Sequence, residues 1–489
     1  MKIKSTKLNY IYHLSYQILL IILPIVTAPY VSRVLLPEGV GDYSLAFSFI
    51  TYFTLFASLG FTYYAQREIA KWQDNPLMQT RVFWEIILCR LIPVFVSLLL
   101  NNVLIYLDLY GEITPLMRLL NINIISIAFD IVFFFQGNED FGKTTLVNIT
   151  VKLLGVAGIF IFVKTPDDVW LYTLLNSLVL IVSNLSLWFF ALPHLRRPKD
   201  DNGKRMPLHL HPFAHLWPSF RLFVPNIAIS LYTILDKTLI GVITADSAQN
   251  GYYEEAEKIV KCAMPVVTAL GTVMIPRNSR EAAIGNMEAV KKNIYQSSHF
   301  VFFLGLPITV GFVLVASNLI PWFLGDAYEE SIYLLQLFAP LTLIIGLSNL
   351  FGLQYLIPCK KDKLFTAAIL AGAITNLVLN IPFITWYQAR GAVFASLISE
   401  SVVTLTMLFF VRKELSCFQT FKSVVKPFLA CALMFAACYP LSKALPSSIL
   451  NTLILVGVGV LVYGVSVLLL RDSLAWGILR KVKEKLSRK

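Results

Sequence analysis

Charged side chains inside long apolar stretches are the residues of this sequence that could carry chemistry. Seven of them are basic: Arg90, Arg118, Lys152, Arg221, Lys237, Lys258 and Lys261. The acidic ones are fewer: Asp130, Asp236, Glu257 and Glu400, with Glu85 near the end of a stretch. Because a charge in hydrocarbon is costly, such residues normally face a polar interior or a pathway. The excess of cations predicts an interior suited to an anionic ligand such as a phosphate.

Six basic residues are candidates for binding that anion: Arg33, Lys152, Arg221, Lys237, Lys258 and Lys261. Glu254, Lys258 and Lys261 have the spacing of one helix face, so an internal ion pair is the alternative for this group. Lys237 follows Asp236, and a local neutral pair packed between helices is the alternative there. Both interpretations stay open on the sequence.

Three acidic residues are candidates for coupling to a proton or Na⁺: Asp130, Asp236 and Glu400. For Asp130, Glu400 and the basic Lys152, structural pairing is the alternative. Arg33 and Arg221 lie near the ends of apolar stretches, where a long basic side chain can instead reach the membrane interface.

Two apparent motifs are better explained without a cofactor. Residues 137–144 satisfy the phosphate-loop pattern G-x-x-x-x-G-K-[ST], but that chemistry needs a strand before the loop, and here apolar membrane stretches flank it. His209, His211 and His215 cluster in a connecting segment, which we interpret as solvated surface. The six cysteines show no metal-ligand spacing. We predict no metal, no cofactor and no catalytic residue.

The composition requires a membrane to position these residues. Of 489 residues, 57% are hydrophobic and only 14% charged, with mean hydropathy +0.69. Soluble domains carry roughly 25% charged residues, so this chain cannot cover a water-facing surface in the ordinary way. A span needs about twenty apolar residues. Fourteen stretches qualify: 10–34, 43–65, 82–107, 115–136, 144–163, 169–191, 218–242, 257–276, 299–319, 332–356, 364–384, 391–411, 427–444 and 449–470.

Basic residues are concentrated in the loops on one side of these spans. The side that holds both termini carries 30 of the 41 Lys and Arg residues, so the positive-inside rule predicts cytoplasmic termini. The tail after Arg471 is expected to form a basic helix on the anionic inner leaflet. Basic residues distributed in this way indicate contact with an anionic membrane surface and do not indicate binding of nucleic acid.

An internal repeat divides the chain. Residues 41–46 and 251–256 both read G-x-Y-x-x-A and both lie on the outer side, six spans apart. We therefore predict two six-helix lobes in the same orientation plus an appended helix pair. The expected parts are an N-lobe over 1–191, a cytoplasmic linker over 192–217, a C-lobe over 218–411, and spans 13 and 14 with a basic tail over 412–489.

Three segments resemble one family of carriers, in register with the fourteen spans. The inner loop Phe135-Gln136-Gly137-x-Glu139-x-Phe141, with Thr144, Thr145 and Lys152 following, resembles that of Wzx-type polysaccharide flippases. So do the segment Arg33-Val34-Leu35-Leu36-Pro37-Glu38-Gly39-Val40-Gly41-x-Tyr43 and the pair Leu235-Asp236-Lys237-x-x-Ile240-Gly241 and Gly251-Tyr252-Tyr253-x-x-Ala256-x-Lys258-Ile259.

The resemblance implies the fold of the multidrug/oligosaccharidyl-lipid/polysaccharide (MOP) exporter superfamily, in which two lobes enclose a cavity that opens alternately to each side. It also implies the substrate, an undecaprenyl-diphosphate-linked repeat unit moved from the inner to the outer leaflet of the bacterial cell membrane for capsule, O-antigen or a similar polymer. Membrane lipids, a polysaccharide polymerase and glycosyltransferases are the expected partners.

Two other classes of function remain open on the sequence. A multidrug exporter of the same fold would favour an acidic, aromatic interior, whereas these spans are net basic. A membrane polymerase or glycosyltransferase usually needs a large outer loop with catalytic carboxylates. The carboxylate pair Asp167 and Asp168 lies in an outer loop of only about five residues.

Overall fold

The computed structural model of the protein describes residues 6–195 and 207–487. This part of the chain is almost entirely helical and contains no β-strand, which confirms the predicted all-α membrane fold. Contacts divide the chain into two compact units, Met1–Thr238 and Leu239–Lys489, and each has its own apolar cores. The division falls inside one helix. Assignment of that whole helix to a C-lobe beginning at residue 218 therefore stays a prediction.

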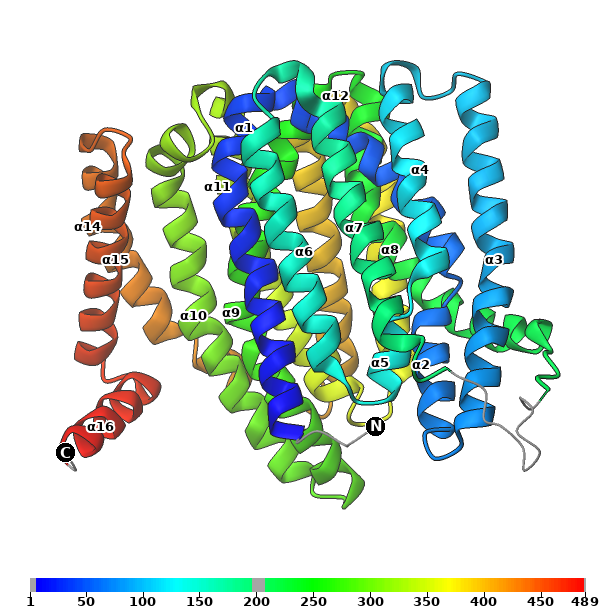
Figure 1. Cartoon of the computed structure of the whole chain (residues 1–489). Coiled ribbons are helices and arrows are strands. Elements are labelled where there is room, and N and C mark those ends of the chain that lie inside the picture. Colours follow the sequence, from blue (N-terminus) through cyan, green and yellow to red (C-terminus); the bar gives the residue numbers. More distant parts are fainter. Residues whose placement is uncertain (1–5, 196–206, 488–489) are drawn as a thin grey trace. The chain divides into compact units, whose positions relative to one another are not determined.

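Helices of the first unit account for the first six predicted spans and the start of the seventh (Figure 1). Within hydrocarbon every backbone polar group must be bonded internally, which is why apolar stretches of this length become helices. They are α1 (Thr6–Ser58), α2 (Phe61–Lys71), α3 (Pro76–Tyr106), η1 (Gly111–Ile113), α4 (Thr114–Phe129), α5 (Val132–Gly137), α6 (Phe141–Phe162), η2 (Pro166–Asp168), α7 (Val169–Ala191), η3 (Pro212–His215) and most of α8 (Leu216–Thr244).

Helices of the second unit include three long ones, of 37, 37 and 50 residues, and a π-helical turn. They are α9 (Ser247–Ala283), α10 (Met287–Phe323), η4 (Asp326–Tyr328), α11 (Glu329–Phe351), the π-turn η5 (Gly352–Leu356), α12 (Asp362–Val411), α13 (Cys417–Lys422), α14 (Val425–Ala444), α15 (Ile449–Leu469) and α16 (Ser473–Ser487). Polar side chains cap several of the starts. Asp246 accepts a hydrogen bond from Ala248 N at 3.0 Å, and Ser448 accepts one from Asn451 N at 3.2 Å.

Eleven helical stretches among the described residues are long and apolar enough to cross a bilayer. Two of them, α1 and α12, are each divided by a residue with positive φ, Leu36 (φ 59°) and Gln388 (φ 52°). With both counted as pairs and α8 added, the fourteen predicted spans are present. The predicted outer loop between residues 34 and 43 is wrong, however, because the helix turns at Leu36 and Pro37 and continues at once.

A second difference from the prediction concerns the end of α1. The span expected over 43–65 ends at Ser58, and a separate helix, α2, begins at Phe61. Gly60 lies between them with φ 71°, and a Cβ there would lie 2.6 Å from the backbone oxygen of Ser219. Only glycine fits both the left-handed conformation and this close approach to α8.

The two copies of the G-x-Y-x-x-A repeat occupy the same place in their helices. Gly41 follows the break in α1 by one turn, and Gly251 follows the start of α9 by one turn. The last alanine of each copy, Ala46 and Ala256, is fully buried. Equivalent positions at the start of the second span in each half support the predicted repeat.

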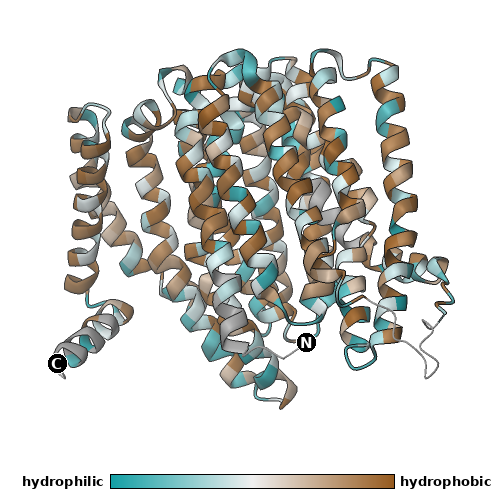
Figure 2. Ribbon diagram, in the orientation of Figure 1, coloured by the Kyte–Doolittle hydropathy of each residue, from teal (hydrophilic) through white to brown (hydrophobic). Residues whose placement is uncertain are grey.

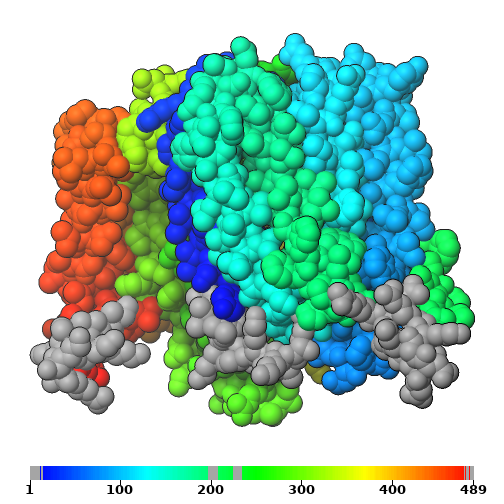
Figure 3. Space-filling view, viewed as in Figure 1, coloured from blue at the N-terminus to red at the C-terminus, as the bar shows by residue number. Residues whose placement is uncertain are grey.

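The pair α14 and α15 packs on α10 within the second unit. Cys431, Met434 and Leu455 are buried in this contact, and the Tyr463 hydroxyl donates to Phe303 O at 2.7 Å. Both helices are apolar along most of their length (Figure 2). Their outward side, orange in Figure 3, exposes large apolar side chains such as Leu453 and Leu461, as a lipid-facing surface requires.

Candidate functional site

Five charged residues lie within two turns of α9 and form what we call the α9 charge cluster: Glu254, Glu255, Glu257, Lys258 and Lys261. The predicted span begins at residue 257, but the helix begins at Ser247, so the whole cluster lies on one continuous helix. Tyr253 anchors the segment, since its buried ring packs 5.1 Å from the ring of Phe338 on α11.

Both lysines of the cluster are paired. Lys258 Nζ lies 3.3 Å from Glu254 Oε1 and 2.8 Å from Glu255 Oε1, and its side chain is 30% exposed. Lys261 Nζ lies 2.7 Å from Glu257 Oε1 and is 50% exposed. The internal ion pairs that the spacing allowed as an alternative are therefore present, and they position the amines on the helix.

Glu255 is the residue of this cluster that sequence reasoning missed. It is only 1% exposed, so the buried end of α9 holds a carboxylate that the span boundaries had placed in a loop. Its i, i+3 spacing from Lys258 was the available signal. The cluster as a whole has three carboxylates and two amines, and is less cationic than predicted.

On α8 the candidates Asp236 and Lys237 lie one turn from a link to α1. Asp236 is buried, at 7% exposure, while Lys237 is half-buried. The hydroxyl groups of Tyr52 and Thr238 lie 3.0 Å apart and join the two helices within the first unit. Asp236 is thus held at a defined place in the helix packing, as a functional or a paired carboxylate would have to be.

The remaining basic candidates of the first unit lie apart from one another. Lys152 on α6 is half-buried, with Nζ 5.6 Å from the ring centre of Tyr16. Arg221 is exposed near the start of α8, its guanidinium 5.3 Å from the ring centre of Trp217. An exposed arginine on a tryptophan is typical of an interface anchor. Arg33 is exposed, one turn before the break in α1.

The acidic candidate Asp130 lies at a break that the sequence did not predict. The expected span 115–136 is divided there into α4 and α5, with Asp130 and Ile131 outside either helix. The Asp130 carboxylate accepts a hydrogen bond from Val132 N at 2.9 Å and so caps α5. The third acidic candidate, Glu400, is half-buried on α12.

Carbonyl groups at this break accept hydrogen bonds from side chains of two neighbouring helices. The Arg90 guanidinium, on α3, donates to Ile127 O at 3.3 Å and to Asp130 O. On α7, Trp188 Nε1 donates to Phe129 O at 2.9 Å. Arg90 is only 1% exposed. It therefore completes the backbone bonding of a broken helix and does not add a cation to a polar interior.

One of the three clustered histidines also has a role that the sequence interpretation missed. His209 and His211 are exposed, as expected, but His215 is buried. Its Nε2 lies 2.9 Å from Glu85 Oε2, and its Nδ1 lies 2.7 Å from the Tyr64 hydroxyl. No group of three or more potential metal ligands occurs in the described residues. The interpretation of His215 as solvated surface is wrong because it connects α2 and α3.

The phosphate-loop pattern at 137–144 is part of the helix packing. It follows the short helix α5 and leads into α6, so no strand precedes it. Gly137 O accepts a hydrogen bond from Gln73 Nε2 at 2.8 Å, and Lys143 Nζ lies 3.1 Å from Asp140 Oδ2. A Cβ on Gly137 would lie 2.8 Å from the Ile69 side chain, which explains the glycine by close packing.

A family of known proteins accounts for this arrangement. Residues 7–282, more than half of the chain, match the family described as polysaccharide biosynthesis protein. The chain belongs to this family. A candidate O-antigen transporter of Escherichia coli strain K12 is 25% identical over 394 residues, covering 80% of this chain and 93% of the relative.

Two solved structures share the fold of this polysaccharide biosynthesis protein. The lipid II flippase MurJ in an inward closed conformation has a TM-score of 0.63 at 16% identity, covering 90% of this chain and 97% of MurJ. An inward-facing multidrug resistance MATE family transporter of the MOP superfamily has a TM-score of 0.65 at 15% identity, covering 84% and 98%. At this identity the likeness shows the fold alone, and it confirms the predicted all-α membrane fold.

A further charged contact of this family member lies at the end of α12. Glu414 accepts hydrogen bonds from Lys361 and from the Tyr355 hydroxyl. Burial alone raises the pKa of this carboxyl, but the two hydrogen bonds outweigh burial, and the resulting pKa is below its ordinary value. The contribution to stability is therefore present above the ordinary carboxyl pKa and is lost as the pH falls through the lowered one.

We expect Glu414→Gln to lower stability near neutral pH and to make no difference in strongly acidic buffer. Since 39% of the Glu414 side chain is exposed, solvent limits the loss to at most about 1 kcal/mol. Thermal unfolding in detergent, followed by circular dichroism at several pH values, measures this. Lys361→Gln should show the same loss at neutral pH. A difference from the unsubstituted protein that grows toward acid would contradict the assignment.

Proposed function

We propose that this protein is a transporter that flips a lipid-linked oligosaccharide from the inner to the outer leaflet of the membrane, and is not an enzyme. The observation that carries the proposal is the family match over residues 7–282 together with likeness to a candidate O-antigen transporter along 80% of the chain. The fold shared with a lipid II flippase supports the same class of substrate. An undecaprenyl diphosphate bearing a capsule or O-antigen type repeat unit fits this description.

The substrate chemistry explains why charged residues are retained in the spans. A diphosphate cannot enter hydrocarbon unless charged or polar groups replace its water. In the α9 charge cluster, Lys258 is held in place by two carboxylates and remains 30% exposed, so its amine can exchange a carboxylate for a phosphate. Lys237 and Lys261 are the other candidates for this role. Arg33, Lys152 and Arg221 are expected to act on the approach of the lipid.

The direction of transport follows from the distribution of charge. We infer that both termini face the cytoplasm of a bacterial cell, because the basic loops lie on that side of the spans. With an inside-negative potential, each negative charge carried fully outward gains about 2.3 kcal/mol per 100 mV. Potential could thus drive the outward step, and Asp130, Asp236 and Glu400 remain the proposed sites if an ion is coupled. Glycosyltransferases would supply the substrate and a polymerase would consume it.

Multidrug export is the second candidate function. The excess of carboxylates over amines in the α9 charge cluster favours a cationic ligand, and the fold is shared with a MATE transporter. The family match and the O-antigen transporter relative favour the lipid-linked glycan.

Reconstitution in phospholipid vesicles tests both candidates directly. A fluorescent undecaprenyl-diphosphate oligosaccharide is incorporated in both leaflets, and a membrane-impermeant quencher reports how fast the inner pool reaches the outside. We expect rapid translocation with the protein and none in protein-free vesicles. Efflux of a lipophilic cation without translocation of the glycolipid would instead establish the multidrug exporter.

A further inference from the structure

A hollow surrounded by basic residues lies at one end of the second unit. It has a volume of about 770 Å³, within the range of small-molecule sites. The first turns of α10 and the connection between α12 and α13 form its walls. Four cations line it: Lys291, Lys292, Arg412 and Lys413. We call this hollow the α10–α13 pocket.

The pocket keeps a net positive charge because the carboxylate of Glu414, one of its two acidic lining residues, is bound by groups outside the pocket. Glu414 is bound by Lys361 and Tyr355, neither of which lines the pocket. Among the described residues, Lys291, Lys292 and Lys413 lie in no ion pair within 4.0 Å. Glu288 is the other acidic lining residue and is exposed. The arrangement leaves several donors available for one anion, with Gln296, Ser416 and Gln419 as polar neighbours.

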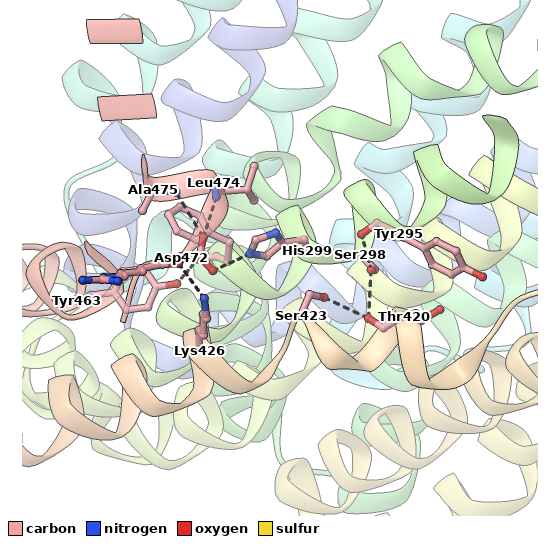
Figure 4. Close-up of polar contacts among 12 residues, drawn as sticks. Tyr295, Ser298, His299, Thr420, Ser423, Lys426, Tyr463, Asp472, Leu474 and Ala475 are labelled. Atoms are coloured by element: carbon pink, nitrogen blue, oxygen red, sulfur yellow. Dashed lines mark hydrogen bonds and ion pairs between the residues drawn. The ribbon is translucent and has the colours of Figure 1, made fainter. Parts of the chain in front are cut away.

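One wall of the pocket is held by a hydrogen bond between His299 and the buried Asp472 (Figure 4). His299 Nε2 lies 2.8 Å from Asp472 Oδ2, and Asp472, which is 1% exposed, also accepts from Leu474 N at 2.9 Å. Lys426 Nζ donates to Arg471 O at 2.7 Å. These contacts join α10 and α14 to the start of α16. They hold His299, and with it this wall of the pocket, in a fixed position.

A second basic hollow adjoins the first across this wall. It has a volume of about 480 Å³ and shares His299, Gln419 and Ser423 with the α10–α13 pocket. Lys422 and Lys426 line it. The positive surface therefore continues from α10 toward α14, along the side of the unit where the apolar helices α14 and α15 begin and end.

Exposed aromatic side chains beside these cations indicate what kind of anion fits. Phe409, Phe418 and Phe428 are 55%, 74% and 59% exposed. The Arg412 guanidinium lies 3.7 Å from the ring centre of Phe409, and Lys422 Nζ lies 6.0 Å from that of Phe418. Basic groups above exposed aromatic rings are typical of the level where headgroups meet acyl chains. A soluble anion would gain nothing from these rings, whereas a lipid would.

We propose that the α10–α13 pocket binds the phosphate headgroup of an anionic glycerophospholipid, whose acyl chains lie along the exposed phenylalanines of α12, α13 and α14. This lipid is a bound ligand of the second unit, separate from the glycolipid that is carried. Binding neutralises cations that would otherwise repel one another and links α10, α12 and α13 at the membrane interface. The site needs phosphate and an acyl chain together.

Cys417 provides a reporter for the test, since it is exposed at the start of α13 and the other five cysteines are buried or half-buried. The full-length protein in neutral detergent is labelled there with an environment-sensitive fluorophore and titrated with dioctanoyl phosphatidylglycerol. Dioctanoyl phosphatidylcholine and inorganic phosphate are titrated separately. We expect saturable binding of phosphatidylglycerol and at least tenfold weaker binding of the other two.

The variant Arg412→Gln/Lys413→Gln should bind phosphatidylglycerol about 30-fold more weakly, because each basic residue near an anionic lipid contributes about fivefold. Arg280→Gln/Lys363→Gln is the matched control, since both residues are exposed, lie in the same unit and do not line the pocket. It should bind as the unsubstituted protein does. Equal weakening of both variants overturns the proposal, as does binding of inorganic phosphate as tight as that of phosphatidylglycerol.

Discussion

We expect Lys258→Gln to abolish translocation of the lipid-linked oligosaccharide in reconstituted vesicles, with a rate at the protein-free background, while the protein still inserts and folds. The expectation follows from its place in the α9 charge cluster, where its amine lies within 3.3 Å of both Glu254 and Glu255. The substitution removes the cation that would meet the diphosphate and leaves two carboxylates that repel it. The lost attraction and the added repulsion together should lower the translocation rate by more than tenfold.

A charge-balanced variant separates ligand binding from simple neutralisation. In Glu254→Gln/Glu255→Gln/Lys258→Gln the repelling carboxylates are gone, so a lysine that merely balanced them would no longer be needed. We expect this triple variant to remain inactive because no amine is left for the phosphate. Glu330→Gln/Arg390→Gln, which removes an ion pair of the same unit outside the cluster, is the control and should keep most of the rate. Full activity of the triple variant would show that Lys258 is structural.

The membrane-spanning architecture was predictable because hydrophobic length alone decides it. Each of the fourteen apolar stretches is helical, and the even number follows from counting them. The breaks at Leu36 and Gln388 lie between predicted spans, but the break at Asp130 lies inside one and was not predictable. Its conformation depends on a partner from another helix. For Asp130 the partner is Arg90, forty residues away in the sequence.

The charged residues of the site were predictable in type but not in partner. The spacing of Glu254 and Lys258 correctly suggested a pair on one helix face. Burial of Glu255 could not be foreseen because hydropathy placed the start of the span at residue 257, whereas the helix begins ten residues earlier, at Ser247. His215 was similarly misjudged, since its partner Glu85 comes from a helix 130 residues earlier.

Arg90 should be the most sensitive single position for stability in the first unit. Its guanidinium is buried between Phe61 and Phe133, with ring centres 5.6 and 5.0 Å away. It donates to Ile127 O, which also accepts from Asp130 N at 3.2 Å, and to Asp130 O in the gap between α4 and α5. Water is scarce at this depth, so a carbonyl that loses its donor gains no replacement. The cost of each unmet buried group is about 1–3 kcal/mol, and charged donors are at the upper end.

Arg90→Met keeps an unbranched apolar stem, shortens the side chain and removes its donors, so we expect a loss of about 3–5 kcal/mol in the free energy of unfolding. Unfolding in mixed detergent micelles, followed by circular dichroism, measures this loss. Arg118→Met is the control, since Arg118 is exposed on α4 and should change stability by less than about 0.5 kcal/mol. Arg90→Lys retains one charged donor that can reach only one of the two carbonyls, and should fall between them. If Arg90→Met were as stable as Arg118→Met, the broken helix would not depend on this guanidinium, and the carbonyls would have to be satisfied by another route.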